Sequence, residues 1–240
     1  MSDFFKFEDD GIDFPFYNGI PELSIVEWVV LAVGPVLVAL FALTGGDFIP
    51  YFNSLPNGAM QISYFLFTII PFAYVCHGKL GLIFKKTRLK DFKIIIPCII
   101  LYILYAGLTR VLGGYLGFSA ASNPITQSAV SILDVVFILF QLMAEELFKV
   151  AVLLIAMGLI YYFTKNRKTT LVFAIFISVM LFGLIHLATY EYNLYQCIVV
   201  IGIGSLIHLY PYLKTKNVFN SYLVHIMIDL ILIGIMSIPH

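Results

Sequence analysis

Charged residues are scarce in this chain. Lys, Arg, Asp and Glu together make up 12% of its 240 residues, whereas apolar residues make up 61%. An average soluble domain is about 25% charged, so the composition excludes a soluble globular domain and identifies an integral membrane protein. The net charge is zero, and no segment resembles the basic face of a nucleic-acid-binding protein. We therefore expect membrane lipids and peptides or membrane proteins as partners, and no nucleic acid.

Cysteine is also rare, and no basic region precedes an apolar core at the N-terminus. Cys76, Cys98 and Cys197 are odd in number, widely spaced and set in apolar runs, so we expect small buried side chains rather than disulfides or a metal cluster. Residues 1–24 are acidic and aromatic, which does not match a signal peptide. We expect this stretch to be a loose or interfacial arm.

Long apolar runs, by contrast, are abundant. In lipid every backbone polar group must be satisfied internally, which favours helices. We predict an all-α, polytopic transmembrane bundle of about seven spans. They cover residues 25–44, 58–76, 92–108, 132–162, 170–190, 193–213 and 218–238.

Basic residues gather in three connections between the predicted spans. These hold 11 of the 14 Lys and Arg residues, namely Lys79, Lys85, Lys86, Arg88, Lys90, Lys93, Lys165, Arg167, Lys168, Lys214 and Lys216. With seven spans the three connections lie on one face, so the positive-inside rule predicts a multi-pass cell-membrane protein with a cytoplasmic N-terminus. The segment 79–90 also has the pattern of an amphipathic basic helix, which we interpret as an orientation signal.

Ionisable residues interrupt three of the later spans. Glu145, Glu146 and Lys149 lie in the fourth predicted span, His186 in the fifth, and His225 with Asp229 in the seventh. Each charge at membrane depth costs roughly 2.5–3.5 kcal/mol on insertion scales. We therefore predict a polar centre inside the bilayer, although an ion pair that only locks helices together explains the glutamates and the lysine as well. We interpret His208 and His77 as lone histidines that hydrogen-bond a neighbour.

Helical spacing indicates how these groups are arranged. Glu145 and Lys149 share one helix face, whereas Glu146 points about 100° away and lies three residues before Lys149. Asp229 follows His225 by one turn, so its carboxylate can orient the imidazole. At 1.5 Å per residue from the basic connections, Glu145 and His186 reach depths of about 27 and 25 Å, but His225 only about 12 Å.

The ordered motifs resemble the CPBP family of intramembrane proteases, the CAAX protease and bacteriocin-processing group. The family pattern is EExxxR, FxxxH and HxxxN or HxxxD on successive spans, and the matching strings here are AEELFK, FGLIH and HIMID. Phe182 with His186 and His225 with Asp229 fit the last two motifs, whereas Lys149 replaces the arginine one residue early. The resemblance covers residues 132–240, and spans in 25–131 match only in being hydrophobic.

The resemblance implies intramembrane hydrolysis of peptide bonds in membrane-associated or lipidated substrates. It implies Glu145 or Glu146 as general base on a water, with His186 holding that water, His225 facing the oxyanion and Asp229 orienting His225. Lys149 and Phe182 would support them. Zinc held by Glu145 or Glu146 with His186 and His225 is an acceptable ligand set, but HExxH spacing is absent and the metal stays open.

Two other classes of protein remain open from the residues alone. An ion-coupled transporter would use the buried Glu, His and Asp groups as a relay near the midplane. A non-catalytic immunity or scaffold protein would keep the protease fold without turnover. As substrates of a protease, prenylated CAAX tails, bacteriocin leaders and membrane-anchored peptides all remain open.

Overall fold

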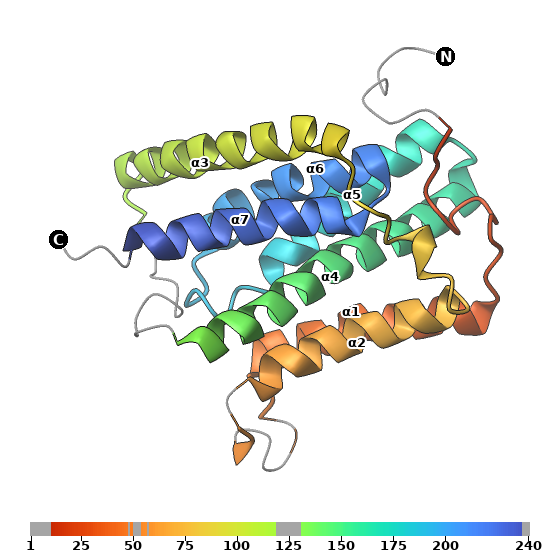
Figure 1. Cartoon of the computed structure of the whole chain (residues 1–240), viewed down its shortest axis with the longest axis horizontal. Helices are drawn as coiled ribbons and strands as arrows, with labels where there is room; N and C mark the ends of the chain where they lie inside the picture. The colour runs from red at the N-terminus through yellow and green to blue at the C-terminus, as the bar shows by residue number, and fades with distance from the viewer. Residues whose placement is uncertain (1–10, 48, 50–53, 57, 119–130, 237–240) are drawn as a thin grey trace.

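The chain folds into a bundle of helices that lie roughly along one direction (Figure 1). The structure, a computed structural model, describes residues 11–236 except 48, 50–53, 57 and 119–130, and omits the side chains of 233–236. The described residues contain helices and no strand, so the predicted all-α membrane bundle is confirmed.

The described part contains seven α-helices and three other helical segments. The α-helices are α1 (Ile25–Thr44), α2 (Ala59–Val75), α3 (Phe92–Tyr115), α4 (Ile132–Thr164), α5 (Arg167–Leu184), α6 (Ser205–Thr215) and α7 (Val218–Met236). Short 3₁₀ turns η3 (Leu80–Leu82) and η4 (Leu89–Asp91) precede α3, and a π-helix, η6 (Tyr195–Ile203), precedes α6. Five segments are long and apolar enough to cross a membrane: α1, Leu89–Tyr115, α4, α5 and Tyr195–Thr215. The apolar helix α2 and the stretch Val218–Leu232 of α7 are shorter.

Three of the predicted spans differ from the structure. The predicted span 92–108 ends seven residues too early, because α3 continues to Tyr115. The predicted span 170–190 ends early, because α5 stops at Leu184 and the chain continues in turns to positive φ at Glu191 and Tyr192. The predicted span 193–213 is divided into η6 and α6 at Gly204. His186 therefore lies just beyond a helix rather than within one.

The central helix of the bundle is α4, which packs against α1, α2, α5 and α7. It begins at a capping box, in which Ser131 accepts from the backbone N–H of Asp134 and the Asp134 carboxylate accepts from Ser131. Such caps satisfy N–H groups that have no partner within the helix. Most side chains from 142 to 157 are buried, whereas the outer faces of α1, α3 and α5 expose apolar residues such as Val29, Ile100 and Phe173. This is the arrangement expected of lipid-facing helices around a packed core.

The N-terminal arm is packed into the bundle over residues 13–17, contrary to the expectation of a loose arm. Phe14 and Phe16 are 1% and 2% exposed, and the Phe14 ring lies against Tyr212 of α6 and under the ammonium of Lys216. Asp13 forms an ion pair with Arg167 at 2.8 Å. Partial burial alone would raise the pKa of Asp13, but the hydrogen bonds it accepts, first from Arg167, hold that pKa below its usual range.

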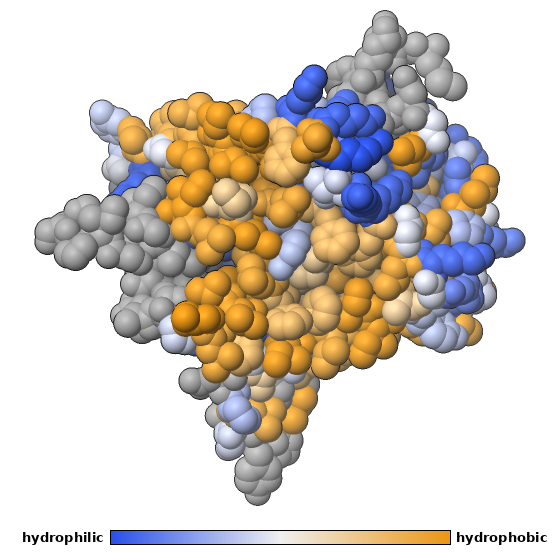
Figure 2. All heavy atoms as spheres, in the orientation of Figure 1, coloured by the Kyte–Doolittle hydropathy of each residue, from blue (hydrophilic) through white to orange (hydrophobic). Residues whose placement is uncertain are grey.

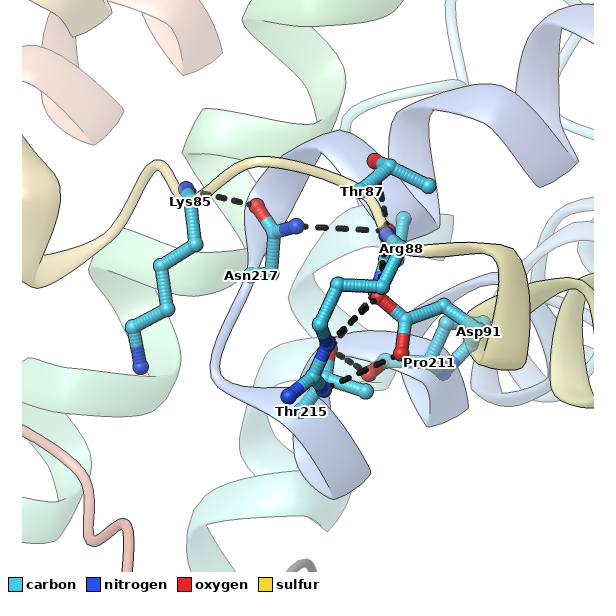
Figure 3. A network of polar contacts seen from close by, with 8 residues as sticks. Lys85, Thr87, Arg88, Asp91, Pro211, Thr215 and Asn217 are labelled. Carbon is cyan, nitrogen blue, oxygen red and sulfur yellow. Dashed lines mark hydrogen bonds and ion pairs between the residues drawn. The ribbon is translucent and has the colours of Figure 1, made fainter.

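The basic segment 79–90 is not the amphipathic helix that its pattern predicted. It holds the 3₁₀ turn η3 and the beginning of η4, and it is tied to the start of α7. The Ile83 carbonyl accepts from Val218 N–H. Lys85 N–H donates to the Asn217 side chain (Figure 3). Arg88 forms an ion pair with Asp91 within the same network (Figure 3). Backbone hydrogen bonds to α7 outweigh the weak helix preference of a short segment.

The turn between α6 and α7 is buried, which explains the depth of His225. Lys216 and Val218 are 0% exposed, because Phe14 and Ile83 cover them. The turn therefore lies inside the bundle rather than at its surface, and α7 starts deeper than α5. The sequence assigns His225 a smaller depth than Glu145 and His186, and the inward position of the turn accounts for this difference.

Two glycines allow α5 and η6 to touch. A Cβ on Gly183 would lie 2.4 Å from the Cys197 carbonyl oxygen and 3.0 Å from the Gly202 Cα. Both atoms belong to backbone, which has little freedom to move. Gly183 lies between Phe182 and His186, so this contact fixes the position of the FxxxH motif.

We predict that Gly183→Ala destabilises the protein by about 1–3 kcal/mol, the usual cost of overpacking a close contact. The matched control is Gly107→Ala on α3, where a Cβ would meet nothing within 4 Å and helix propensity favours alanine. Thermal unfolding in detergent measures both. A Gly183→Ala melting temperature equal to that of the control would contradict the close contact.

Candidate active site

A buried ion pair on α4 forms the base of the site. Glu146 and Lys149 are both 0% exposed, and the Lys149 Nζ lies 2.6 Å from the Glu146 Oε1. The two residues are three apart and share a helix face. The lysine thus neutralises the second glutamate rather than Glu145, which also lies at a suitable spacing. An unpaired charge at this depth would be strongly unfavourable.

His225 of α7 completes this buried network. Its Nδ1 lies 2.7 Å from the same Glu146 oxygen, and its Nε2 lies 3.8 Å from the Glu145 Oε2. The sequence predicted that Asp229 would orient this ring. Within the described residues no hydrogen bond joins Asp229 to His225, and the carboxylate that holds the ring is that of Glu146.

Glu145 differs from its neighbour because it faces a cavity. Its side chain is 13% exposed, and the Gln141 amide donates to its Oε1 at 3.0 Å. The cavity has a volume of about 860 Å³, and its lining includes Glu145, His186, His208, His225 and Asp229. The structure therefore brings the three predicted groups Glu145, His186 and His225 to one cavity, with Glu146 behind its wall.

His186 is held by the residue one turn before it. Its Nδ1 lies 2.8 Å from the Phe182 carbonyl oxygen, and a carbonyl only accepts, so Nδ1 carries the proton. In a neutral ring Nε2 then keeps its lone pair, free to accept from a water. The Phe182 ring packs edge-on against His186, with centroids 4.8 Å apart, and the Lys149 ammonium lies 4.5 Å from the Phe182 centroid. Phe182 thus links the histidine to the buried ion pair.

No pattern in the sequence indicates that His208 belongs to this cluster. Its ring lies 4.4 Å from the rings of both Tyr102 and His225. Contrary to the prediction of a satisfied histidine, neither ring nitrogen has a hydrogen-bond partner among the described residues, and the Glu146 Oε2 has none either. Its α6 neighbours are apolar, so only the packing of α6 on α7 reveals this role. Asp134, which caps the start of α4, is not in the described lining of the cavity.

Three of these residues offer a metal-binding set that differs from the predicted one. One ligand atom each from Glu146, His208 and His225 lies within 4.8 Å of the others. Two histidines and a carboxylate suit zinc, and the partnerless atoms of Glu146 and His208 fit a further ligand. Zinc bound there would polarise a substrate carbonyl as a Lewis acid. Lys149 already supplies positive charge to the same carboxylate, which weakens the attraction for a cation.

The fold and site together define a helical membrane protein with a glutamate and histidine centre buried within its bundle. Residues 124–231 match the family model of type II CAAX prenyl endopeptidase Rce1-like proteins. The match includes every candidate residue on α4, α5, α6 and α7, and it confirms the resemblance to the CPBP group. The searches of curated proteins and of solved structures each found no match.

We predict that Lys149→Ala unfolds the protein far more readily than Lys149→Arg. Removing one partner of a buried pair costs about 3–5 kcal/mol, since the remaining charge is left alone, whereas arginine keeps the cation. Detergent melting curves of both variants test this. Equal stability of Lys149→Ala and wild type would show that the pair does not hold the bundle together.

Proposed function

We propose that the protein hydrolyses peptide bonds of membrane-associated or lipidated peptides, with Glu145 as the general base. The observation that carries this proposal is the division between the two glutamates: Glu146 is bound to Lys149 and His225, whereas Glu145 lines the cavity with His186. The Rce1-like family match supports a CAAX-type protease at the level of the family.

The reaction begins with a water between the Glu145 carboxylate and the free Nε2 of His186. Glu145 takes one proton while the water oxygen bonds to the peptide carbonyl carbon, whose oxygen becomes an oxyanion. The C–N bond then breaks, and Glu145 returns the proton to the departing nitrogen. One water is consumed, and the products are a carboxylic acid and an amine, which become a carboxylate and an ammonium when the remaining hydroxyl proton passes to the amine.

His225 is the group that we assign to the developing oxyanion. The Glu146 carboxylate at its Nδ1 stabilises a protonated ring, whose Nε2–H can then donate into the cavity. Donors held in place before reaction stabilise the transition state without reorganisation. Asp229 lines the same cavity one turn further along α7, and we assign it a supporting electrostatic role.

We expect Glu145→Gln to lower cleavage roughly 100-fold or more, the usual contribution of a general base, while leaving the melting temperature unchanged. The matched control is Asp134→Asn, the same change of acid to amide on the same helix at a residue outside the cavity lining. It should retain activity. Purified protein is incubated with prenylated and unmodified peptides in detergent, with and without a chelator.

Several outcomes of that assay would count against the proposal. Wild-type rates in Glu145→Gln would remove Glu145 from the chemistry. Absence of cleavage of every peptide by folded wild type would favour the scaffold interpretation. Loss of cleavage with chelator would indicate a bound metal and count against a metal-free mechanism.

A further inference from the structure

The two ends of the bundle carry different amounts of positive charge. The ends of α2, α4 and α6 lead into the connections that hold 11 of the 14 basic residues. We call this the basic end, defined by residues 79–93, 165–168 and 214–216. Figure 2 shows hydrophilic surface gathered toward this end, with hydrophobic surface over the middle of the molecule. Arg110, near the end of α3, is the one basic residue at the opposite end in the part of the chain described here.

The cavity is lined mainly by the parts of the helices that lie away from the basic end. Its lining includes the last turns of α1 and α3, the first turns of α2, and the connection that follows α5. Representative residues are Ala42, Gln61, Gly114, Thr189 and Asn193. Glu145 lies about 20 Å from the first residue of α4 and about 29 Å from its last at 1.5 Å per residue, so it too is nearer that end.

The basic end, in contrast, is closed over the site. The α6–α7 turn is buried at Lys216 and Val218, and Phe14 and the segment at Ile83 lie over it. Tyr212 beneath them is 0% exposed. A peptide arriving from the basic end would have to displace this packed layer, whereas the described lining of the cavity lies at the other end of the helices.

We infer that the cavity opens on the extracytoplasmic face of the membrane and receives peptide segments presented from that side. The basic connections resist translocation and mark the cytoplasmic face, and the cavity lies at the other end of the same helices. The direction of opening does not depend on the proposed protease activity, but the assignment of the occupant as a substrate does.

Cysteine labelling from outside tests the direction of opening. Thr189→Cys and Gln61→Cys place thiols in the cavity lining, whereas Lys86→Cys and Lys168→Cys place them at exposed positions of the basic end. The native cysteines are 5% exposed or less, so unmodified wild type serves as the blank. Spheroplasts expressing each variant are treated with a membrane-impermeant maleimide before and after lysis.

We expect the two cavity variants to react before lysis and the two basic-end variants only after it. The reverse pattern, labelling of all four from one side, or no labelling of the cavity variants would overturn the inference. A second arm uses a peptide that cannot cross lipid, added to right-side-out or inverted vesicles. Cleavage confined to right-side-out vesicles supports a substrate from outside, and cleavage confined to inverted vesicles overturns it. External labelling without cleavage in either would instead refute the proposed function.

Discussion

Charge buried in an apolar bundle must be paired, and the Glu146–Lys149 pair is the contact on which the rest of the site depends. Both side chains are fully buried, where either charge alone would cost several kcal/mol. The pair lies on the central helix, so α7 reaches it through His225 and α5 through the Phe182 ring. Three helices are thereby aligned around one carboxylate.

That alignment gives two adjacent glutamates different environments. One oxygen of Glu146 binds both a cation and an imidazole, and Glu146 is not in the described lining of the cavity. Glu145, turned about 100° around the helix, accepts one hydrogen bond from Gln141 and faces the open space. Neighbouring carboxylates in unlike surroundings are a common way to divide structural and chemical roles. The structural interpretation of the trio and the catalytic one are therefore compatible.

The sequence predicted the helices and most of the cavity residues because both depend on local patterns. Hydrophobic runs of sufficient length locate α1 and α4 almost to the residue, and charge in such runs marks Glu145, Glu146 and Lys149. The place of His208 and the partner of His225 depend instead on how α6 and α7 pack against each other. No spacing within one helix contains that information, so Asp229 was the natural candidate for a role that Glu146 fills.

The buried turn between α6 and α7 is another feature that the sequence does not predict, and the reason is physical. Depth counted along each helix assumes that every connection begins at the membrane surface, which is wrong for the turn at Lys216. Phe14 of the N-terminal arm covers the turn. The arm is far from α7 in sequence, so counting residues along α7 does not reveal this contact. The arm therefore supports the site indirectly, because it closes the end of the bundle from which α7 carries His225 inward.

The early lysine of the first motif also has a physical explanation. In EExxxR the cation follows the second glutamate by four residues, and in this chain Lys149 follows Glu146 by three. Both spacings lie on one helix face, so either cation can neutralise the same carboxylate. A compact ammonium fits at 2.6 Å from Glu146 and 4.5 Å from the Phe182 ring centroid, whereas a guanidinium is planar and longer. The departure from the family pattern thus preserves the pairing that leaves Glu145 free to face the cavity.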